Sequence, residues 1–551
     1  MTLQVFSSYA FEIYNGSWVN VTSDVRHDLR PKWNRGIMSN RQADRVGQPG
    51  FLTFTLNNSI SNSAGLAGYY SPGHANCWAG WTTGLAVRLS FGFDGVTRYK
   101  YYGHIKPDGI DVEPGIYGAR TVAVTCGDFM WRAALHELKG MAFAQNQNIG
   151  QLVTLINANM PVAPLATSIA TGVENFPTIF DMLGTRTTPL AEYIKGAMSE
   201  WGYIYVIGDK TGGETLVVEN QTTRTSSVAV TSLSLPSAES EAIMDESGVT
   251  IQDELGVDIL ADAVQSASFD NTMVEGMVVS YGKNVANRVI DTAYPRRVDA
   301  AATIVLWALQ KSFRVRAGET ITGYVGAYRD PANPKTKVSG IDMQAMVSGT
   351  DYTATVNEDG TGGSMTASLV VTPDFTDTAR VSFTLQNTHA STDLWIQILQ
   401  VKGKGVYVYE TIQNVQDDTA AQAAQHGVIP LTLDHKYQAD ARKAAIFASY
   451  VLSKEAYPRQ AVDACPIWAN SDSMRMAGFL QLEPGTKATF VETQSGVSHD
   501  YFINGYSAEL YPGKDGMPYV LWTPVLKDDP GFYVFWIAGV ARAGIDTAPG
   551  F

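Results

Sequence analysis

Residues 244–259 read MDESGVTIQDELGVDI and contain one pattern twice, Asp-Glu-x-Gly-Val-x-Ile, beginning at Asp245 and again at Asp253. The four carboxylates of the two Asp-Glu pairs suggest a calcium loop. Such a loop needs oxygen ligands at alternate positions and a glycine at the sixth. Here Gly248 follows Asp245 after only two residues, and apolar residues such as Val249 stand where ligands are needed. Each copy therefore predicts an acidic turn followed by a short strand, and cation binding is the alternative.

Histidine and cysteine offer two further candidate metal ligands. His74 and Cys77 lie close together in SPGHANCW, but the neighbouring glycine and proline predict a loop. No second ligand pair is nearby, whereas a zinc site needs three or four ligands. His136, in LHELKG, lacks the second histidine of a zinc-binding helix. We expect no metal and no cofactor.

Two glycine-rich stretches have a faint likeness to phosphate loops. They are GDKTGG at 208–213 and GKGV at 403–406, and neither has the P-loop spacing. Both are better interpreted as hairpin turns. No Gly-x-Ser-x-Gly elbow occurs, and no serine has persuasive histidine and aspartate partners. A glycosidase pair of carboxylates needs no sequence motif and stays open. The residues give no positive support for an enzyme, and we expect none.

Composition limits the classes of protein further. The chain has 551 residues with 45% hydrophobic content, 17% charged residues, three cysteines and a formal net charge of −14. An acidic protein should repel nucleic acid as a whole. Sparse cysteines argue against a disulfide framework and favour folding in a reducing cytoplasm. The N-terminus does not read as a secretion signal, and the apolar stretch 532–540 is too short to cross a bilayer. We expect a soluble protein that leaves a cell by a route other than secretion.

The elements that would position these residues are mainly strands. Residues 1–140 contain FLTFTLNN, LAVRLSFGF, YKYYGHI and RTVAVTCGD, which are short apolar runs separated by Gly, Asp and Pro. They predict a first β-barrel or curled sheet. A helical pattern begins at WRAALHELKGMAFA, and residues 141–235 are predicted to form a helix–hairpin α+β region. Residues 236–304 are predicted to form a ribbon and connector that includes the acidic repeat.

The helix of this middle region has a clear start. Thr188 is the expected N-cap and Pro189 the first helical residue. Apolar residues then recur at three- and four-residue steps and predict the buried face; they are Leu190, Ile194, Ala197, Met198 and Trp201. YIYVIGDKTGGETLVVEN follows as a β-hairpin.

Residues 305–410 predict an inserted β-sandwich, because strands follow one another with no helix between them. In ARVSFTLQNT, Val381, Phe383 and Leu385 alternate with polar residues, as in a half-buried strand. Residues 411–530 predict a second barrel with one helix at about 436–454, and 531–551 a C-terminal strand and tail. The expected fold is mainly β, with two barrel-like domains, a smaller α+β part and the sandwich.

Four aromatic residues of the sandwich region are candidate sugar contacts. They are Trp307, Tyr324, Tyr328 and Trp395, and aromatic rings with a polar group suit both sugars and protein interfaces. Packing within the sandwich core is the alternative.

The order of the pieces resembles the baseplate hub, or tail-tip hub, proteins of long-tailed bacteriophages. The resemblance begins at DVRHDLRPKWNRGIMSNRQADRVGQPGFLTFTLNN, continues through YSPG and VTCGDFMW, and includes TTPLAEYIKGAMSEWGYIYV. YFINGYSAEL and FWIAGVARAGIDT are similar to the final strands of that family. The resemblance covers most of 20–300 and 411–545. Each motif is weakly specific, and the weight lies in their order.

The resemblance implies a structural virion protein of the tail tip, assembled in the host cytoplasm. Family hubs are homotrimers with two similar barrels in each chain, so six barrels match the hexameric tail tube above a threefold tip. Implied partners are the distal tail ring, tail tube, tape measure and central fibre, while DNA passes through without specific binding. A hexameric distal tail ring protein is one alternative. The other is a protein that binds or cleaves a host-surface glycan through the sandwich.

Overall fold

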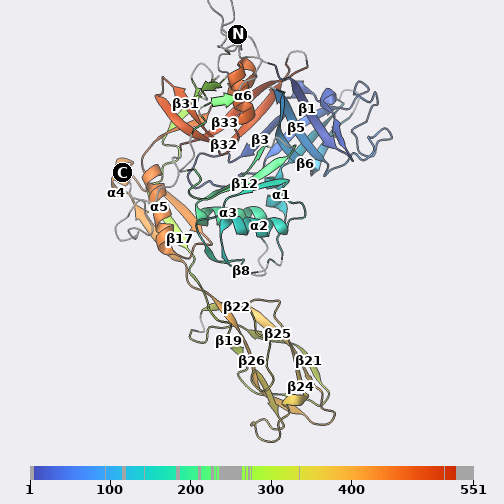
Figure 1. Cartoon of the computed structure of the whole chain (residues 1–551), viewed down its shortest axis with the longest axis vertical. Helices are drawn as coiled ribbons and strands as arrows, with labels where there is room; N and C mark the ends of the chain where they lie inside the picture. Colours follow the sequence, from blue (N-terminus) through green and yellow to red (C-terminus); the bar gives the residue numbers. More distant parts are fainter. Residues whose placement is uncertain are drawn as a thin grey trace, which may run out of the picture.

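The computed structural model of the chain describes residues 5–93, 95–114, 120–139, 141, 143–180, 187–208, 212–224, 229–230, 232–234, 264–266, 268–270, 274, 276–333, 336–513 and 516–528. The acidic repeat at 244–259 and the C-terminal strand and tail at 531–551 lie outside these residues. Strands make up 45% of the structure and helices 16%, so the predicted mainly β class is confirmed. The structure has a large body and a smaller one, and the smaller body lies at the lower end of the molecule in Figure 1. Within the described ranges, no helix has the length and apolar character to span a membrane.

The largest sheet joins strands from both ends of the chain. Its main path runs β15-β31-β32-β3-β4-β7-β6-β5-β1-β2, and β33 pairs with both β32 and β30. These strands are β1 (Ser8–Tyr14), β2 (Trp18–Asn20), β3 (Lys32–Gly36), β4 (Phe51–Asn57), β5 (Ala86–Phe93), β6 (Val96–Glu113), β7 (Thr121–Gly127), β15 (Ser268–Phe269), β30 (Ile467–Trp468), β31 (Lys487–Glu492), β32 (Val497–Tyr511) and β33 (Tyr519–Lys527).

Strand β3 connects the two regions that were predicted to form separate barrels. It pairs antiparallel with β4 on one side and with β32 on the other, for instance Lys32 with Thr53 and with Glu509. The twelve strands of the large sheet therefore form one open, continuous sheet, and closed barrels are not confirmed. A shared core of apolar residues from both regions packs on this sheet.

A helix that was not predicted helps to close this core. Helix α6 (Ser473–Gln481) follows the short 3-10 turn Ala469–Ser471, and its Phe479 is fully buried. The Phe479 ring lies 5.4 Å from Phe91, 6.2 Å from Trp33 and 6.4 Å from Trp522, centroid to centroid. Edge contacts between rings stabilise such a cluster beyond the area that it buries. One C-terminal residue thus packs on rings from both ends of the chain.

A helix–hairpin module occupies the middle of the chain. Its elements are α1 (Phe129–Leu135), β8 (Ala144–Gln147), α2 (Ile149–Ala158), β9 (Ala166–Ile169), β10 (Phe176–Ile179), α3 (Pro189–Glu200), β11 (Tyr203–Gly208) and β12 (Glu214–Glu219). Thr188 caps α3 by accepting a hydrogen bond from the Ala191 amide at 3.2 Å, as expected. One residue of the predicted buried face is wrong: Ile194 is 47% exposed. Tyr193 is buried in its place, because the face that contacts α2 is rotated from the predicted stripe.

A small α/β layer lies beside this module. Strand β17 (Arg288–Ala293) pairs with β27 (Ile412–Asp417) and β28 (Pro430–His435), and α5 (Ala441–Glu455) covers them. The helix predicted at about 436–454 is α5, which begins five residues later. The large body also contains α4 (Thr419–Ala424) and two strand pairs. These are β16 (Val278–Tyr281) with β29 (Gln460–Ala464), and β13 (Ser232–Ser234) with β14 (Val264–Ser266).

The inserted module consists of two sheets that share one core, which is the arrangement of a β-sandwich. In one sheet, β26 (Leu394–Val408) pairs with β18 (Arg296–Val298), β19 (Ile304–Ala308), β20 (Phe313–Val315), β22 (Lys337–Ile341) and β23 (Tyr352–Thr355). The other is β21 (Thr320–Ala327), β25 (Arg380–Asn387) and β24 (Leu369–Asp374). Val381, Phe383 and Leu385 are buried, as their alternation predicted. This module stands apart from the large sheet (Figure 1).

Deleting residues 299–405 and joining the ends with a short Gly-Ser linker should leave the rest folded. Val298 and Val406 are paired in register, so the linker spans only neighbouring strands. The sandwich also has its own core. We expect the linker to cost no more than about 1 kcal/mol, since closure cost depends weakly on loop length. Circular dichroism melts and size-exclusion chromatography check this outcome. Aggregation of the remainder would show that the sandwich belongs to the main core.

Candidate functional site: the joint between the large sheet and the helix–hairpin module

Among the described residues, no group of three or more His, Cys, Asp and Glu side chains is placed to hold a metal ion. His74 Nδ1 instead accepts a hydrogen bond from the Asn76 amide at 3.0 Å within its loop. Cys77 is half-buried and Cys126 and Cys465 are buried, and all three are free thiols. The most concentrated chemistry lies elsewhere. It is a set of buried charged side chains where β11 of the helix–hairpin module lies against β3 and β6 of the large sheet. We call this region the joint.

Lys100 and Glu483 form an ion pair at the centre of the joint. Lys100 is on β6 and is 1% exposed, while Glu483 follows α6. The Lys100 ammonium also donates to the Phe479 carbonyl at 2.7 Å, and Glu483 Oε2 accepts from the Gly208 amide at 3.1 Å. Burial lowers the pKa of Lys100, and the Glu483 carboxylate opposes that shift. The pair thus links β6, the segment after α6 and the end of β11.

Arg35, on β3, lies beside this pair and is fully buried. Its guanidinium carbon is 5.7 Å from the centre of the Tyr101 ring. None of its three guanidinium nitrogens has a hydrogen-bond partner within the described part of the chain. A buried cation without hydrogen bonds is costly unless carboxylates compensate its charge. Glu483, Glu214 and Asp128 supply that compensation.

Asp128 and Glu214 are the second pair of buried groups in the joint. Asp128 is the N-cap of α1, and its Oδ1 accepts hydrogen bonds from the Gly50 and Trp131 amides, each at 3.0 Å. Glu214, on β12, is 3.4 Å from the Arg132 guanidinium. Burial raises the pKa of the Asp128 carboxyl to about 6. Burial and the neighbouring Asp128 charge raise the pKa of Glu214 to about 7. These carboxyls therefore lose their protons at a higher pH than exposed ones do, and they compensate the charge of Arg35 once they are ionised.

The contribution of these two carboxyls to the stability of the protein should consequently fall as the pH rises from about 4 to 7. Both folded-state pKa values lie above the ordinary values of 3.8 and 4.5. The contribution of these protons is complete below the ordinary values and is lost as the pH passes through the raised ones. Each pKa unit corresponds to roughly 1.4 kcal/mol. Urea unfolding at a series of pH values should show a flatter profile for Asp128→Asn/Glu214→Gln than for the unsubstituted chain. Parallel profiles would contradict the assignment.

A second group of contacts extends the joint along β11 and β12. The Arg224 guanidinium pairs with Glu219 at 2.8 Å and donates to the Asn504 side-chain oxygen of β32, also at 2.8 Å. Its central carbon is 3.6 Å from the centre of the Tyr203 ring. Arg45 lies 3.8 Å from the Trp201 ring and donates to the Trp201 carbonyl at 2.8 Å. Cation–aromatic contacts are strongest when both groups are desolvated, as here.

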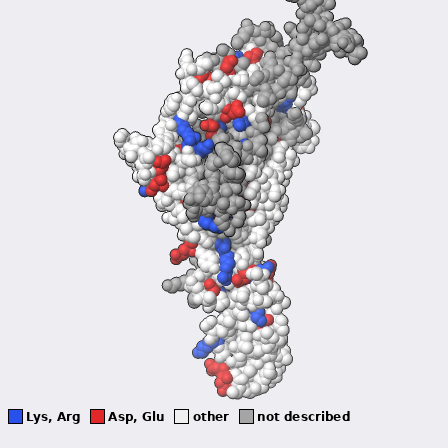
Figure 2. Space-filling model, turned by 60° about the vertical axis from the view of Figure 1, so that its left-hand side comes forward, with Lys and Arg blue, Asp and Glu red and all other residues white. Residues whose placement is uncertain are grey.

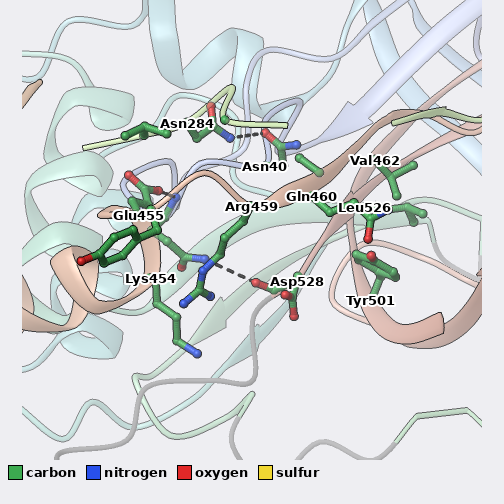
Figure 3. A pocket seen from close by; sticks show the side chains of 15 residues that line it. Asn40, Asn284, Lys454, Glu455, Arg459, Gln460, Val462, Tyr501, Leu526 and Asp528 are labelled. Carbon is green, nitrogen blue, oxygen red and sulfur yellow. Dashed lines mark hydrogen bonds between the residues drawn. The ribbon is translucent and has the colours of Figure 1, made fainter. Parts of the chain in front are cut away.

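A small pocket marks the seam between the large sheet and the α5 layer (Figure 3). Asn284 donates to the Asn40 side-chain oxygen at 2.8 Å, and Glu455 accepts from the Gln42 amide at 2.9 Å. The cavity volume is about 70 Å³. Pockets for small molecules usually enclose about 300–1,000 Å³. We therefore interpret this pocket as a polar seam between packed parts of the chain.

The four predicted sugar contacts do not share one surface. Tyr328 is buried in the sandwich core, and Trp307 packs against Phe383 at 5.3 Å between ring centres. Tyr324 stacks on Phe313 at 4.9 Å. Trp395 is half-buried and is not part of the core cluster. The structure thus brings Trp307, Tyr324 and Tyr328 together around the core and leaves Trp395 apart. Binding of a glycan by these residues stays a prediction.

No protein-family model and no curated protein matches the chain. The chain is similar in outline to two solved structures. One is the 43 kDa tail protein of prophage MuSo2 from Shewanella oneidensis, with a TM-score of 0.44, 11% identity, and coverage of 95% of this chain and 100% of that one. The other is the tail protein from Neisseria meningitidis MC58, with a TM-score of 0.41, 9% identity, and coverage of 94% and 96%. Both of these structures are described as tail proteins, and the first is from a prophage.

Proposed function

We propose that the chain is a structural protein of a phage tail, the hub that joins a hexameric tail tube to a threefold tip. The observation that carries the proposal is the pairing of β3 with β32. This pairing joins the first and last regions of the chain in one sheet. A chain that supplies two adjoining segments of a ring needs such a connection between them. The buried charges of the joint hold the helix–hairpin module against that sheet.

The order of sequence motifs supports the same role. The segment 24–58 supplies β3 and β4, the segment 187–206 supplies α3 and β11, and the segment 501–510 lies within β32. All three resemble hub proteins in sequence, and they meet at the joint. The sandwich at 304–408 is a decoration outside this common part. The proposed partners are other copies of the chain and the neighbouring tail proteins: the distal tail ring, the tube, the tape measure and the central fibre.

Surface charge is compatible with a channel through which DNA passes without being bound. On the face drawn in Figure 2, Lys and Arg occur in small groups among Asp and Glu, and most of the described surface in that view is uncharged. The net charge of −14 makes the chain as a whole repel a polyanion. We propose a role in the virion without catalysis, at the tail tip, after assembly in the host cytoplasm.

The mass of the purified full-length chain tests the proposed symmetry. Native mass spectrometry should show an assembly of three chains, because a hub with two ring segments in each chain needs three copies to match six tube subunits. An assembly of six would favour the distal tail ring protein instead. A size that changes after Trp395→Ala would show that the sandwich takes part in assembly, against its proposed place outside the ring.

A further inference from the structure

One outer face of the large sheet carries aromatic side chains where polar ones are usual. Across β2, β1, β5 and β6, the register aligns Trp18 with Tyr14, Ala86 with His104, and Arg88 with Tyr102 and Glu12. Residues in register share a face, and their neighbours Ile13 and Val87 are buried on the other face. Tyr14 is 45% exposed. We call the set Tyr14, Trp18, Ala86, Tyr102 and His104 the aromatic face (strands β1, β5 and β6 in Figure 1).

The rings of the aromatic face surround a depression. Tyr14 and Trp18 lie 5.3 Å apart, and Tyr102 is 6.2 Å from Trp18 and 5.6 Å from His104, centroid to centroid. The small side chain of Ala86 stands between them in the register. Strands β1 and β6 flank β5, so Tyr14 and His104 start about 10 Å apart, which is two strand spacings. The depression has a volume of about 330 Å³, and Gly84 and Leu85 complete its lining.

The walls and floor leave room for a flat ring. A Cβ placed on Gly84 would meet no atom within 4 Å, so the space above this residue is open. The volume is at the lower end of the range for small-ligand sites, roughly 300–1,000 Å³. Ser17, directly before β2, and Asn20, the last residue of β2, are exposed and polar.

Polar groups of the aromatic face are arranged without net charge. The Arg88 guanidinium donates to Glu12 at 2.7 Å and lies 4.0 Å from the Trp18 ring, so the charge of Arg88 is compensated beneath the rings. His104 Nδ1 is buried and has no hydrogen-bond partner among the described residues. Burial and the nearby Arg132 lower the pKa of His104 to about 4, so its imidazole is neutral at physiological pH. A neutral imidazole both donates and accepts hydrogen bonds.

We propose that the aromatic face binds a neutral pyranose ring of a saccharide. The apolar face of a sugar ring packs on the exposed Tyr14 ring and the half-buried Trp18 ring, and its hydroxyls meet the Tyr14 hydroxyl and His104. The Tyr102 ring is buried against Trp18 and supports it. A neutral sugar suits this site because aromatic rings and uncharged hydrogen-bonding groups lie side by side in one shallow depression. The site is separate from the sandwich and does not depend on the proposed hub function.

Titration of the full-length chain with three neutral trisaccharides tests the proposal. Maltotriose, cellotriose and N,N′,N″-triacetylchitotriose are uncharged and differ in the configuration of the 1,4 linkage or in the group at C2, and saturation-transfer NMR with calorimetry measures their binding. We expect saturable binding of at least one of them. Trp18→Ala should weaken it roughly tenfold, because one aromatic contact is removed, and Trp18→Phe should restore part of it. Trp468→Ala is the matched control and should leave binding unchanged, because Trp468 is a half-buried tryptophan of β30 that packs on Tyr511, away from both candidate sugar sites.

Several results would overturn the proposal. One is no saturable binding of any of the three trisaccharides by a chain with an unchanged melting profile. Another is binding that Trp395→Ala abolishes and Trp18→Ala does not, which would move the site to the sandwich. A third is a change in native mass on Trp18→Ala without sugar binding, which would identify the aromatic face as a contact between copies.

Discussion

Replacing Lys100 with methionine is expected to lower the free energy of unfolding by about 3–5 kcal/mol, the usual cost of removing one partner from a buried ion pair. Methionine fills a similar volume, so the loss is mainly electrostatic. Lys100 is 1% exposed, and its removal leaves Glu483 Oε1 and the Phe479 carbonyl without this donor. Chemical denaturation followed by tryptophan fluorescence measures the change.

An exposed ion pair supplies the control for this substitution. Arg26 and Asp28 are 2.7 Å apart with side chains 38% and 55% exposed. Arg26→Met should therefore cost no more than about 1 kcal/mol. Adding Glu483→Gln to Lys100→Met should recover part of the lost stability, because the stranded charge is removed. Similar losses for Lys100→Met and Arg26→Met would show that the joint does not hold the modules together.

Truncating Trp201 to alanine should have an effect of similar size, about 3–5 kcal/mol. Trp201 ends α3 in a left-handed conformation and is fully buried. Its ring stacks on Phe447 of α5 at 5.2 Å and 9° and lies 3.8 Å from the Arg45 guanidinium. The substitution therefore opens a cavity where the helix–hairpin module meets the α5 layer.

Ile194→Ala on the same helix is the matched control, because Ile194 is 47% exposed. It should cost less than about 1 kcal/mol in thermal or urea unfolding. If Ile194→Ala were as damaging as Trp201→Ala, the packing face of α3 would be the stripe that the sequence predicted rather than the one in the structure.

Local patterns predicted the elements well where short-range chemistry decides them. Thr188 and Pro189 define the start of α3, and the alternation at Val381, Phe383 and Leu385 defines β25. Helix α6 escaped prediction because its residues from Ser473 to Leu480 are all buried. A helix buried on every side has no polar stripe, so periodicity does not reveal it.

The joint could not be predicted, because its partners are far apart in sequence. The pairing of β3 with β32 and the contact of Lys100 with Glu483 each join segments nearly 400 or more residues apart. A lysine in the apolar run YKYYGHI was the available signal, since a charge in a central strand needs a buried partner. The aromatic face was missed for a related reason: Tyr14, Trp18 and Tyr102 become neighbours only through the register of four strands.

The most direct test of the hub assignment is the position of the chain in the particle. A short tag in the exposed turn at 358–362 of the sandwich can be located by electron cryomicroscopy of intact phage. If the chain is the hub, three tags related by a threefold axis should surround the end of the tail that meets the host. Six tags in a ring, or tags along the length of the tail, would contradict it.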